Sequence, residues 1–179
     1  FDLVDTPLDD PTSTTTTTSD TTTLPGHIIV SLRKATKKDV TSKLKAVEEL
    51  QLIVIDACNL EYIQSAVFGK HFTKVFARLS VDPERRVREA IFTLLLRICE
   101  DNARRRVLNH VIGELAFYWL GALYDPVSGV STVARKCLDT SFPTPDKLKQ
   151  FVNTVKMQSR QMTVETVQFR AEEAREQAL

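Results

Sequence analysis

Apolar side chains recur at intervals of three and four residues through most of the chain, which is the spacing of one face of an α-helix. The clearest case spans residues 82–100, where one apolar stripe consists of Val87, Ile91, Leu94, Leu95 and Ile98. We expect Asp82 to cap this helix, with Pro83 at its first position. Similar patterns predict helices over residues 27–35, 41–57, 60–80, 103–124, 130–142 and 145–157. Residues 163–178 are polar on most sides, and three interpretations stay open for them: a cap of the stack, a solvent-facing helix or disorder. Few stretches alternate in the manner of a strand, so the sequence predicts an all-α fold.

The helical pattern repeats. Asp82-Pro83 recurs 43 residues later as Asp125-Pro126, and 43 residues earlier the chain has Asp39. Each aspartate is followed five and eight positions later by an apolar residue; these are Leu44, Val87 and Val130, then Val47, Ala90 and Val133. A period of 43 is typical of helix-pair repeats and excludes ankyrin or tetratricopeptide repeats. We predict about three helix pairs followed by C-terminal helices.

The string Asp-Pro-x-x-x-Val-Arg-x-x-Ala at residues 82–90 resembles the start of the second helix of a HEAT repeat. The fold expected is therefore a HEAT/armadillo-like solenoid. The resemblance also implies a ladder of ion pairs between an aspartate and the basic residue six positions later in neighbouring repeats. Its expected members are Asp39, Lys45, Asp82, Arg88 and Asp125, with Asp39 and Lys45 as the weaker rung. Ser131 departs from the pattern, and Arg135 is a candidate to replace it.

The first 23 residues differ from the rest. They are rich in Thr, with a run from Thr14 to Thr18, and contain five Asp but no Lys or Arg. Such a segment buries too little apolar surface to order itself, so we expect residues 1–23 to be a disordered linker. Residues 24–179 are expected to form the repeat domain. The chain begins with Phe1 and shows no signal peptide, so we expect a fragment of a longer protein.

Composition gives little support for catalysis. His27, His71 and His110 are scattered, and the three cysteines contain no Cys-x-x-Cys pair. We expect no metal, no cofactor, no catalytic residue and no small-molecule substrate. The cysteines, Cys58, Cys99 and Cys137, are expected to be buried reduced thiols of a cytosolic protein. The most apolar stretch, residues 107–124, contains Asn109, His110 and Glu114, which favours a buried helix over a membrane span.

Charge carries more information. After residue 23 the chain has 24 basic and 18 acidic side chains, so the repeat domain is moderately basic. Because equivalent turns of a solenoid stack along one edge, basic residues near these turns are expected to form a ridge. The candidates are Lys34, Lys37, Lys38, Lys43, Arg85, Arg86, Arg104 and Arg105. Two interpretations remain open: a surface for an anionic partner, and ordinary solvated charge.

Residues 32–50 resemble the N-terminal signature of the listerin family of ubiquitin ligases. The matching residues are Lys37, Lys38, Asp39, Thr41, Lys43, Lys45, Ala46, Glu49 and Leu50, with Ser42 and Val47 as mild departures. Residues 72–90 resemble a second listerin segment, with Phe72 where Trp is expected. The resemblance covers residues 28–100, and beyond them it rests on the repeat pattern alone.

The resemblance implies a non-catalytic N-terminal docking module of an E3 ubiquitin ligase whose RING domain lies far away at the C-terminus. The implied process is ribosome-associated quality control in the cytosol. The implied partners are the large ribosomal subunit, through its rRNA and proteins, and a NEMF-type tRNA-sensing factor. The alternative is a HEAT-repeat scaffold that binds acidic protein partners, as a transport adaptor does.

Overall fold

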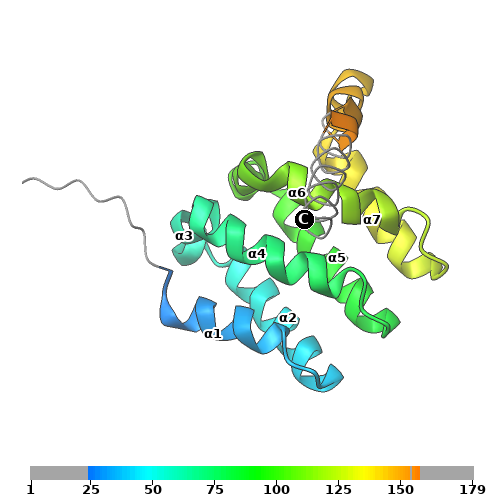
Figure 1. Ribbon diagram of the computed structural model, residues 1–179. Helices are drawn as coiled ribbons and strands as arrows, with labels where there is room; N and C mark the ends of the chain where they lie inside the picture. Colours follow the sequence, from blue (N-terminus) through cyan, green and yellow to red (C-terminus); the bar gives the residue numbers. More distant parts are fainter. Residues whose placement is uncertain (1–23, 154, 158–179) are drawn as a thin grey trace, which may run out of the picture.

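The computed structural model describes residues 24–153 and 155–157, and within them every regular element is helical (Figure 1). The α-helices are α1 (Gly26–Ala35), α2 (Val40–Ile55), α3 (Leu60–Gln64), α4 (Ala66–Leu79), α5 (Arg85–Glu100), α6 (Leu108–Ala122) and α7 (Ser128–Ser141). Two 3-10 helices, η1 (Ala57–Asn59) and η2 (Arg104–Val107), lie between them, and residues 145–153 and 155–157 are helical. The all-α prediction is confirmed. The linker expected over 1–23 and the polar segment 163–178 lie outside the described residues.

Three helix pairs stack into two layers, as expected for a helical-repeat solenoid. The pairs are α1 with α2, α4 with α5, and α6 with α7. In one layer α5 packs between α2 and α7, and in the other α4 packs against both α1 and α6 (Figure 1). Because successive second helices lie side by side, the turns that precede them lie at one edge of the molecule.

Three helix boundaries differ from the sequence prediction. The helix expected over 60–80 is interrupted at Ser65, whose Oγ accepts a hydrogen bond from the Phe68 backbone N–H (3.1 Å) and so caps α4. The helix expected over 103–124 begins with the 3-10 turn η2. Helix α5 is capped by Glu84 and not by Asp82. The Asp82 carboxylate instead accepts a hydrogen bond from the Glu84 N–H (3.0 Å) and pairs with Lys43.

The core between the layers is organised by aromatic side chains. Phe68, Phe72 and Phe76 are four residues apart on α4, so their rings follow one another, with centroids 5.8 and 5.7 Å apart. Phe92 of α5 meets Phe76 edge to face at 5.2 Å, which joins the two helices of the middle pair. Cys99 and Cys137 are buried reduced thiols as expected, but Cys58 is exposed because it lies in the short turn η1.

Helices α4 and α6, in the layer that also contains α1, approach closely at Gly69. A Cβ atom added at Gly69 would lie 3.1 Å from Val111 Cγ1 and 3.2 Å from Val107 Cγ2. Both valines are buried, and a β-branched side chain has few rotamers with which to move aside. The glycine that weakens α4 in isolation therefore permits the contact between neighbouring repeats.

We predict that Gly69→Ala destabilises the domain by about 1 kcal/mol. Overpacking costs about 1–3 kcal/mol, which outweighs the gain of up to about 1 kcal/mol in helix propensity. Gly121→Ala in α6 is the matched control, because an added Cβ meets nothing within 4 Å there. It should be neutral or stabilising by up to about 1 kcal/mol. Urea unfolding followed by circular dichroism measures both changes, and equal stabilisation by the two variants would contradict the close-contact argument.

Candidate functional site

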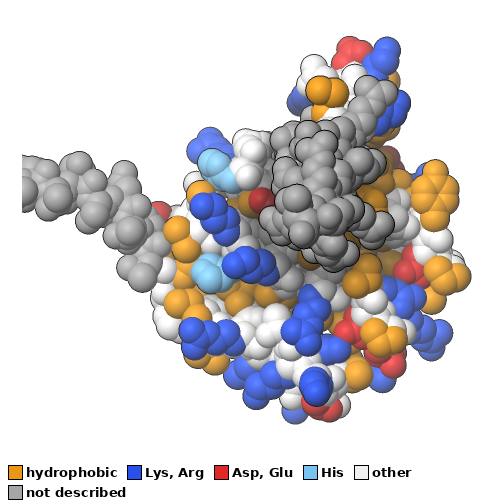
Figure 2. Space-filling model, in the orientation of Figure 1, with side chains coloured by type: hydrophobic (Ala, Val, Ile, Leu, Met, Phe, Trp, Pro, Cys, Tyr) orange, Lys and Arg blue, Asp and Glu red, His pale blue; other side chains and the backbone are white. Residues whose placement is uncertain are grey.

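The candidate site is a basic edge, which we define as Lys37, Lys38, Arg85 and Arg86. Lys37 and Lys38 lie in the turn before α2, and Arg85 and Arg86 form the start of α5. All four side chains are exposed. The turns before α2, α5 and α7 follow one another along the lower right of the molecule (Figure 1). Figure 2 shows Lys and Arg side chains gathered along the lower part of the same view.

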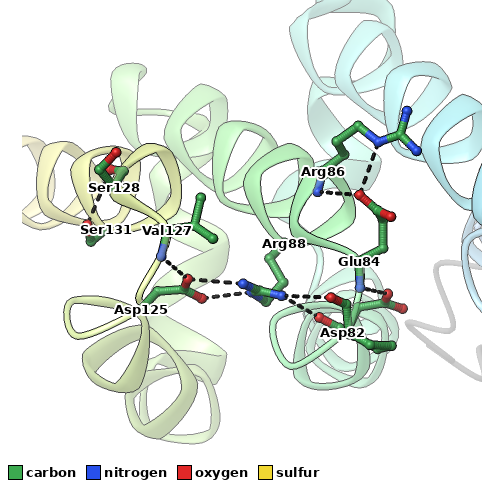
Figure 3. A network of polar contacts seen from close by, with 9 residues as sticks. Asp82, Glu84, Arg86, Arg88, Asp125, Val127, Ser128 and Ser131 are labelled. Atoms are coloured by element: carbon green, nitrogen blue, oxygen red, sulfur yellow. Dashed lines mark hydrogen bonds and ion pairs between the residues drawn. The ribbon is translucent and has the colours of Figure 1, made fainter.

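A ladder of ion pairs runs beneath this edge. Arg88 of α5 donates two hydrogen bonds to Asp125, from Nε to Oδ2 (2.7 Å) and from Nη2 to Oδ1 (3.0 Å). Its Nη1 donates to the backbone carbonyl of Asp82 (2.8 Å). In Figure 3 the guanidinium lies between the Asp125 turn and the Asp82 turn. Only 13% of the Arg88 side chain and 9% of the Asp125 side chain are exposed, so this rung is shielded from water.

The next rung joins Lys43 of α2 to Asp82. Lys43 Nζ donates to Asp82 Oδ2, and the two side chains are 11% and 5% exposed. This contact corrects two expectations. Lys43 was expected to bind a partner but is buried in the ladder, whereas Lys45, expected in the ladder, is exposed. Asp82 joins the two rungs, because its carboxylate accepts a hydrogen bond from Lys43 and its backbone carbonyl accepts one from Arg88.

The shift from Lys45 to Lys43 follows from where each helix starts. Asp39 is the N-cap of α2, with Oδ2 accepting from the Ser42 N–H (2.7 Å), but Glu84 is the N-cap of α5. Lys43 and Arg88 are therefore both the fourth residue after an N-cap, and they occupy the same place on their helices. Counting from the aspartates hides this equivalence, because α2 begins directly after Asp39 and α5 begins three residues after Asp82.

The outer members of the expected ladder have other partners. Asp39 is exposed, and its capping hydrogen bond from Ser42 holds its pKa below the ordinary value. Ser131 is the fourth residue after the Val127 N-cap, the place of Lys43 and Arg88, but its neutral hydroxyl cannot form an ion pair and donates to the Ser128 carbonyl (3.2 Å). Arg135, the candidate replacement, is exposed.

Three further candidates are held by contacts within the domain. Lys34 pairs with Glu49 (3.2 Å), with both side chains nearly half exposed. Arg104 donates to the Ile55 carbonyl (2.9 Å) at the last residue of α2. Arg105 donates to the Thr140 carbonyl (3.1 Å) near the end of α7. Both arginines thus satisfy carbonyl groups that helix C-termini leave without an intrahelical donor.

The basic edge is partly neutralised by the capping acids. Glu84 Oε1 accepts from Arg86 Nε (3.0 Å), and this contact lowers the pKa of Glu84. The Arg86 side chain remains 65% exposed. The turn before α2 therefore presents two cations and one acid, Asp39. The turn before α5 presents two cations and one acid, Glu84.

A groove that the sequence analysis did not identify lies beside the ladder. It is a hollow of about 730 Å³ between the α4–α5 turn, the end of α6 and the α6–α7 turn. Three large apolar side chains that line it are exposed: Val81 (66%), Phe117 (69%) and Tyr124 (89%). The sequence held a signal for this groove, because a large apolar residue, Val81 or Tyr124, directly precedes each of the two aspartates of the ladder.

No cluster of three or more His, Cys, Asp or Glu side chains suited to a metal ion occurs in residues 24–153 and 155–157. In the same part of the chain, no helix combines the length and hydropathy that crossing a membrane requires. His27, His71 and His110 are exposed on α1, α4 and α6.

We predict that Arg88→Met destabilises the domain by about 3 kcal/mol, because it leaves the Asp125 carboxylate buried without its cation. Arg97→Met on the same helix is the control. Arg97 pairs with Glu100 on the surface, with side chains 51% and 45% exposed, and its loss should cost under about 0.5 kcal/mol. Urea unfolding at pH 7 measures both. Equal effects of the two substitutions would show that the shielded rung contributes no more than a surface pair.

The pairing of Arg88 with Asp125 also predicts that the unfolding free energy of the domain depends on pH. Hydrogen bonding by Arg88 lowers the pKa of Asp125 below its ordinary value of 3.8. The carboxylate therefore contributes stability that is fully present above that value and is lost as pH falls through the lower, folded-state pKa. The stability difference between the wild type and Asp125→Asn should be constant from pH 7 to pH 5 and shrink below pH 3.8. Unfolding free energies across this range test it, and a difference that grows on acidification would contradict it.

Comparison with known proteins gives one consistent result. The family model described as the N-terminal domain of the E3 ubiquitin-protein ligase listerin matches residues 19–167. Similar curated proteins are the listerin E3 ubiquitin-protein ligases of Mus musculus (32% identical over 116 residues), Gallus gallus (26% over 117) and Neurospora crassa (28% over 111). These alignments cover 63%, 63% and 62% of this chain but 6%, 6% and 7% of the relatives.

The chain thus spans less than a tenth of the length of these relatives. No solved structure matches it. The family model covers both the basic edge and the ladder, in agreement with the resemblance seen in residues 32–50 and 72–90. On this evidence the chain belongs to the family of listerin N-terminal domains.

Proposed function

We propose that this domain docks a listerin-type E3 ubiquitin ligase on stalled large ribosomal subunits, with the basic edge against rRNA. The observation that carries the proposal is the position of the four exposed cations. Arg85 and Arg86 are in the first turn of α5, and Lys37 and Lys38 directly precede α2. Arg85 and Arg86 oppose the dipole of α5, at a cost of about 0.3–1 kcal/mol each, so stability alone does not explain the placement of these two. Lys37 and Lys38 also follow the C-terminus of α1, where the dipole favours cations.

A phosphate ligand accounts for this arrangement. The N-termini of α2 and α5 direct their positive dipole ends toward the same edge, and the capping carboxylates of Asp39 and Glu84 each accept from one backbone N–H there. The exposed cations add to this positive potential, and the ladder holds the two helix starts in register. A surface of this kind suits the backbone of a folded RNA, which proteins recognise largely through shape and phosphate contacts.

We further propose the cellular setting that docking implies. The domain would act in the cytosol, in ribosome-associated quality control, with rRNA, ribosomal proteins and a NEMF-type tRNA-sensing factor as neighbours. Ubiquitin transfer to the nascent chain would belong to a RING domain elsewhere in the ligase. This chain would position the ligase without taking part in the chemistry.

A second candidate is a HEAT-repeat scaffold that binds acidic protein partners, such as a transport adaptor. The apolar groove beside the ladder favours it, because exposed large apolar groups commonly mark protein-binding surfaces. An acidic protein would use the basic edge and the groove together. An RNA backbone would use the edge and leave Phe117 and Tyr124 uninvolved.

We predict that reversing Lys37, Lys38, Arg85 and Arg86 to Glu abolishes co-sedimentation with purified large ribosomal subunits at low salt. The physical reason is loss of up to four phosphate contacts, each of which steepens the salt dependence by about one unit in the logarithmic slope. Helicity should be unchanged, because none of these side chains belongs to the ladder. Sedimentation and circular dichroism measure the two quantities.

The matched control reverses four exposed cations away from the edge, Lys70, Lys74, Arg135 and Lys136, which gives the same change in net charge. It should retain co-sedimentation. Equal loss in both variants would indicate nonspecific attraction, and retained binding by the edge variant would refute the proposed contact. The double variant Phe117→Ser, Tyr124→Ser separates the rRNA contact from the acidic-protein contact. It should weaken binding of the partner only if that partner is a protein that occupies the groove.

A further inference from the structure

A second hollow lies at the opposite end of α7 from the ladder. It has a volume of about 400 Å³ and lies between η2, the start of α6, the end of α7 and the helical residues after 144. Phe142 and Phe151 hold this corner together, with their rings stacked at 4.6 Å and Phe151 against Trp119 of α6 at 5.7 Å. The hollow is thus built on packed core residues.

Its floor is apolar and its polar groups are cationic or neutral. Leu108, Ile112, Phe142 and Phe151 form the apolar part, and Arg105 and Lys147 provide two positive charges. None of the described residues that line it is acidic. The nearby carboxylate of Asp101 accepts a hydrogen bond from the Arg104 N–H (2.9 Å) and does not line the hollow. The two positive charges therefore have no counter-charge among the described residues of the lining.

Two buried polar atoms at this site also lack hydrogen-bond acceptors or donors. The Arg105 terminal nitrogens donate to the Thr140 carbonyl and to Asn102 Oδ1, both of them neutral acceptors, and Nε has no acceptor among the residues that the structure describes. Ser141 is 7% exposed, and its Oγ makes no hydrogen bond of normal geometry within the described residues, where it meets only the weakly bonding thiol of Cys99. Unpaired buried polar groups of this kind destabilise a fold unless a ligand satisfies them.

We propose that this hollow binds a carboxylate that adjoins an apolar side chain, as presented by an acidic peptide segment of a partner protein. The carboxylate would lie between Arg105 and Lys147, and the apolar group would cover Ile112 and Phe142. A nucleotide fits less well. Phe151 is only 4% exposed and Phe142 is partly buried, so a base would have little open ring face on which to stack. The site is separate from the basic edge and does not depend on ribosome docking.

The probe is N-acetylphenylalanine, which carries one carboxylate and one apolar ring, and the control ligand is its neutral amide. Titration of the ¹⁵N-labelled 179-residue chain should give saturable shifts of the Ser141, Phe142 and Phe151 amide signals. The amide should bind about tenfold more weakly, the change that corresponds to loss of one favourable charge contact. Lys147→Gln should weaken binding of the acid about two- to fivefold, as for an exposed ion pair.

Lys70→Gln on α4 is the matched control, because Lys70 is exposed and does not line the hollow. It should leave the affinity unchanged. Lys147 is itself exposed, so its replacement should not disturb folding. Equal affinity for acid and amide, or unchanged affinity of the Lys147 variant, would overturn the proposal. Tighter binding of uridine monophosphate than of N-acetylphenylalanine would overturn it in favour of a phosphate ligand.

Discussion

The shielded ladder from Lys43 through Asp82 and Arg88 to Asp125 is the interaction on which the arrangement of the repeats depends. An ion pair removed from water contributes little net stability compared with a well-packed apolar pair, but a buried charge without its partner costs about 3–5 kcal/mol. Sliding one repeat along the next would separate Arg88 from Asp125 and Lys43 from Asp82. The ladder therefore selects one register among the several that the apolar surfaces alone would permit. The close approach at Gly69 restricts the opposite layer in the same way.

This fixed register explains how the proposed interface can form from separate parts of the chain. Lys37 and Arg85 are far apart in sequence, and each belongs to a different repeat. The rung between Lys43 and Asp82 ties the start of α2 to the turn before α5, which brings both pairs of cations to one edge. Residues buried in the ladder and residues exposed on the edge alternate within a few positions, as Arg86 and Arg88 illustrate.

The fold was predictable because its signals are local or periodic. The apolar stripe of residues 82–100 and the 43-residue repeat of Asp39, Asp82 and Asp125 require no knowledge of contacts between helices. The candidate site was only partly predictable. Whether a Lys near a turn is buried or exposed depends on the residue at which the helix starts. The first repeated aspartate, Asp39, is itself the cap of α2, whereas α5 is capped by Glu84, two residues after Asp82. The residue that pairs with Asp82 is therefore Lys43 and not Lys45. Arg104 and Arg105 could not be assigned, since their acceptors are backbone carbonyls of distant helix ends.

The junctions on the two sides of the third helix pair, α6 with α7, differ in mechanical terms. Between α5 and α7, the twin hydrogen bonds of Arg88 to Asp125 resist both twisting and sliding, because they are directional. At the corner beyond α7, the chain is held by contacts among Trp119, Phe142 and Phe151. Aromatic contacts tolerate a range of ring angles. The stack is therefore stiff through its first three helix pairs and more compliant at this corner, so bending strain applied to the array would concentrate there.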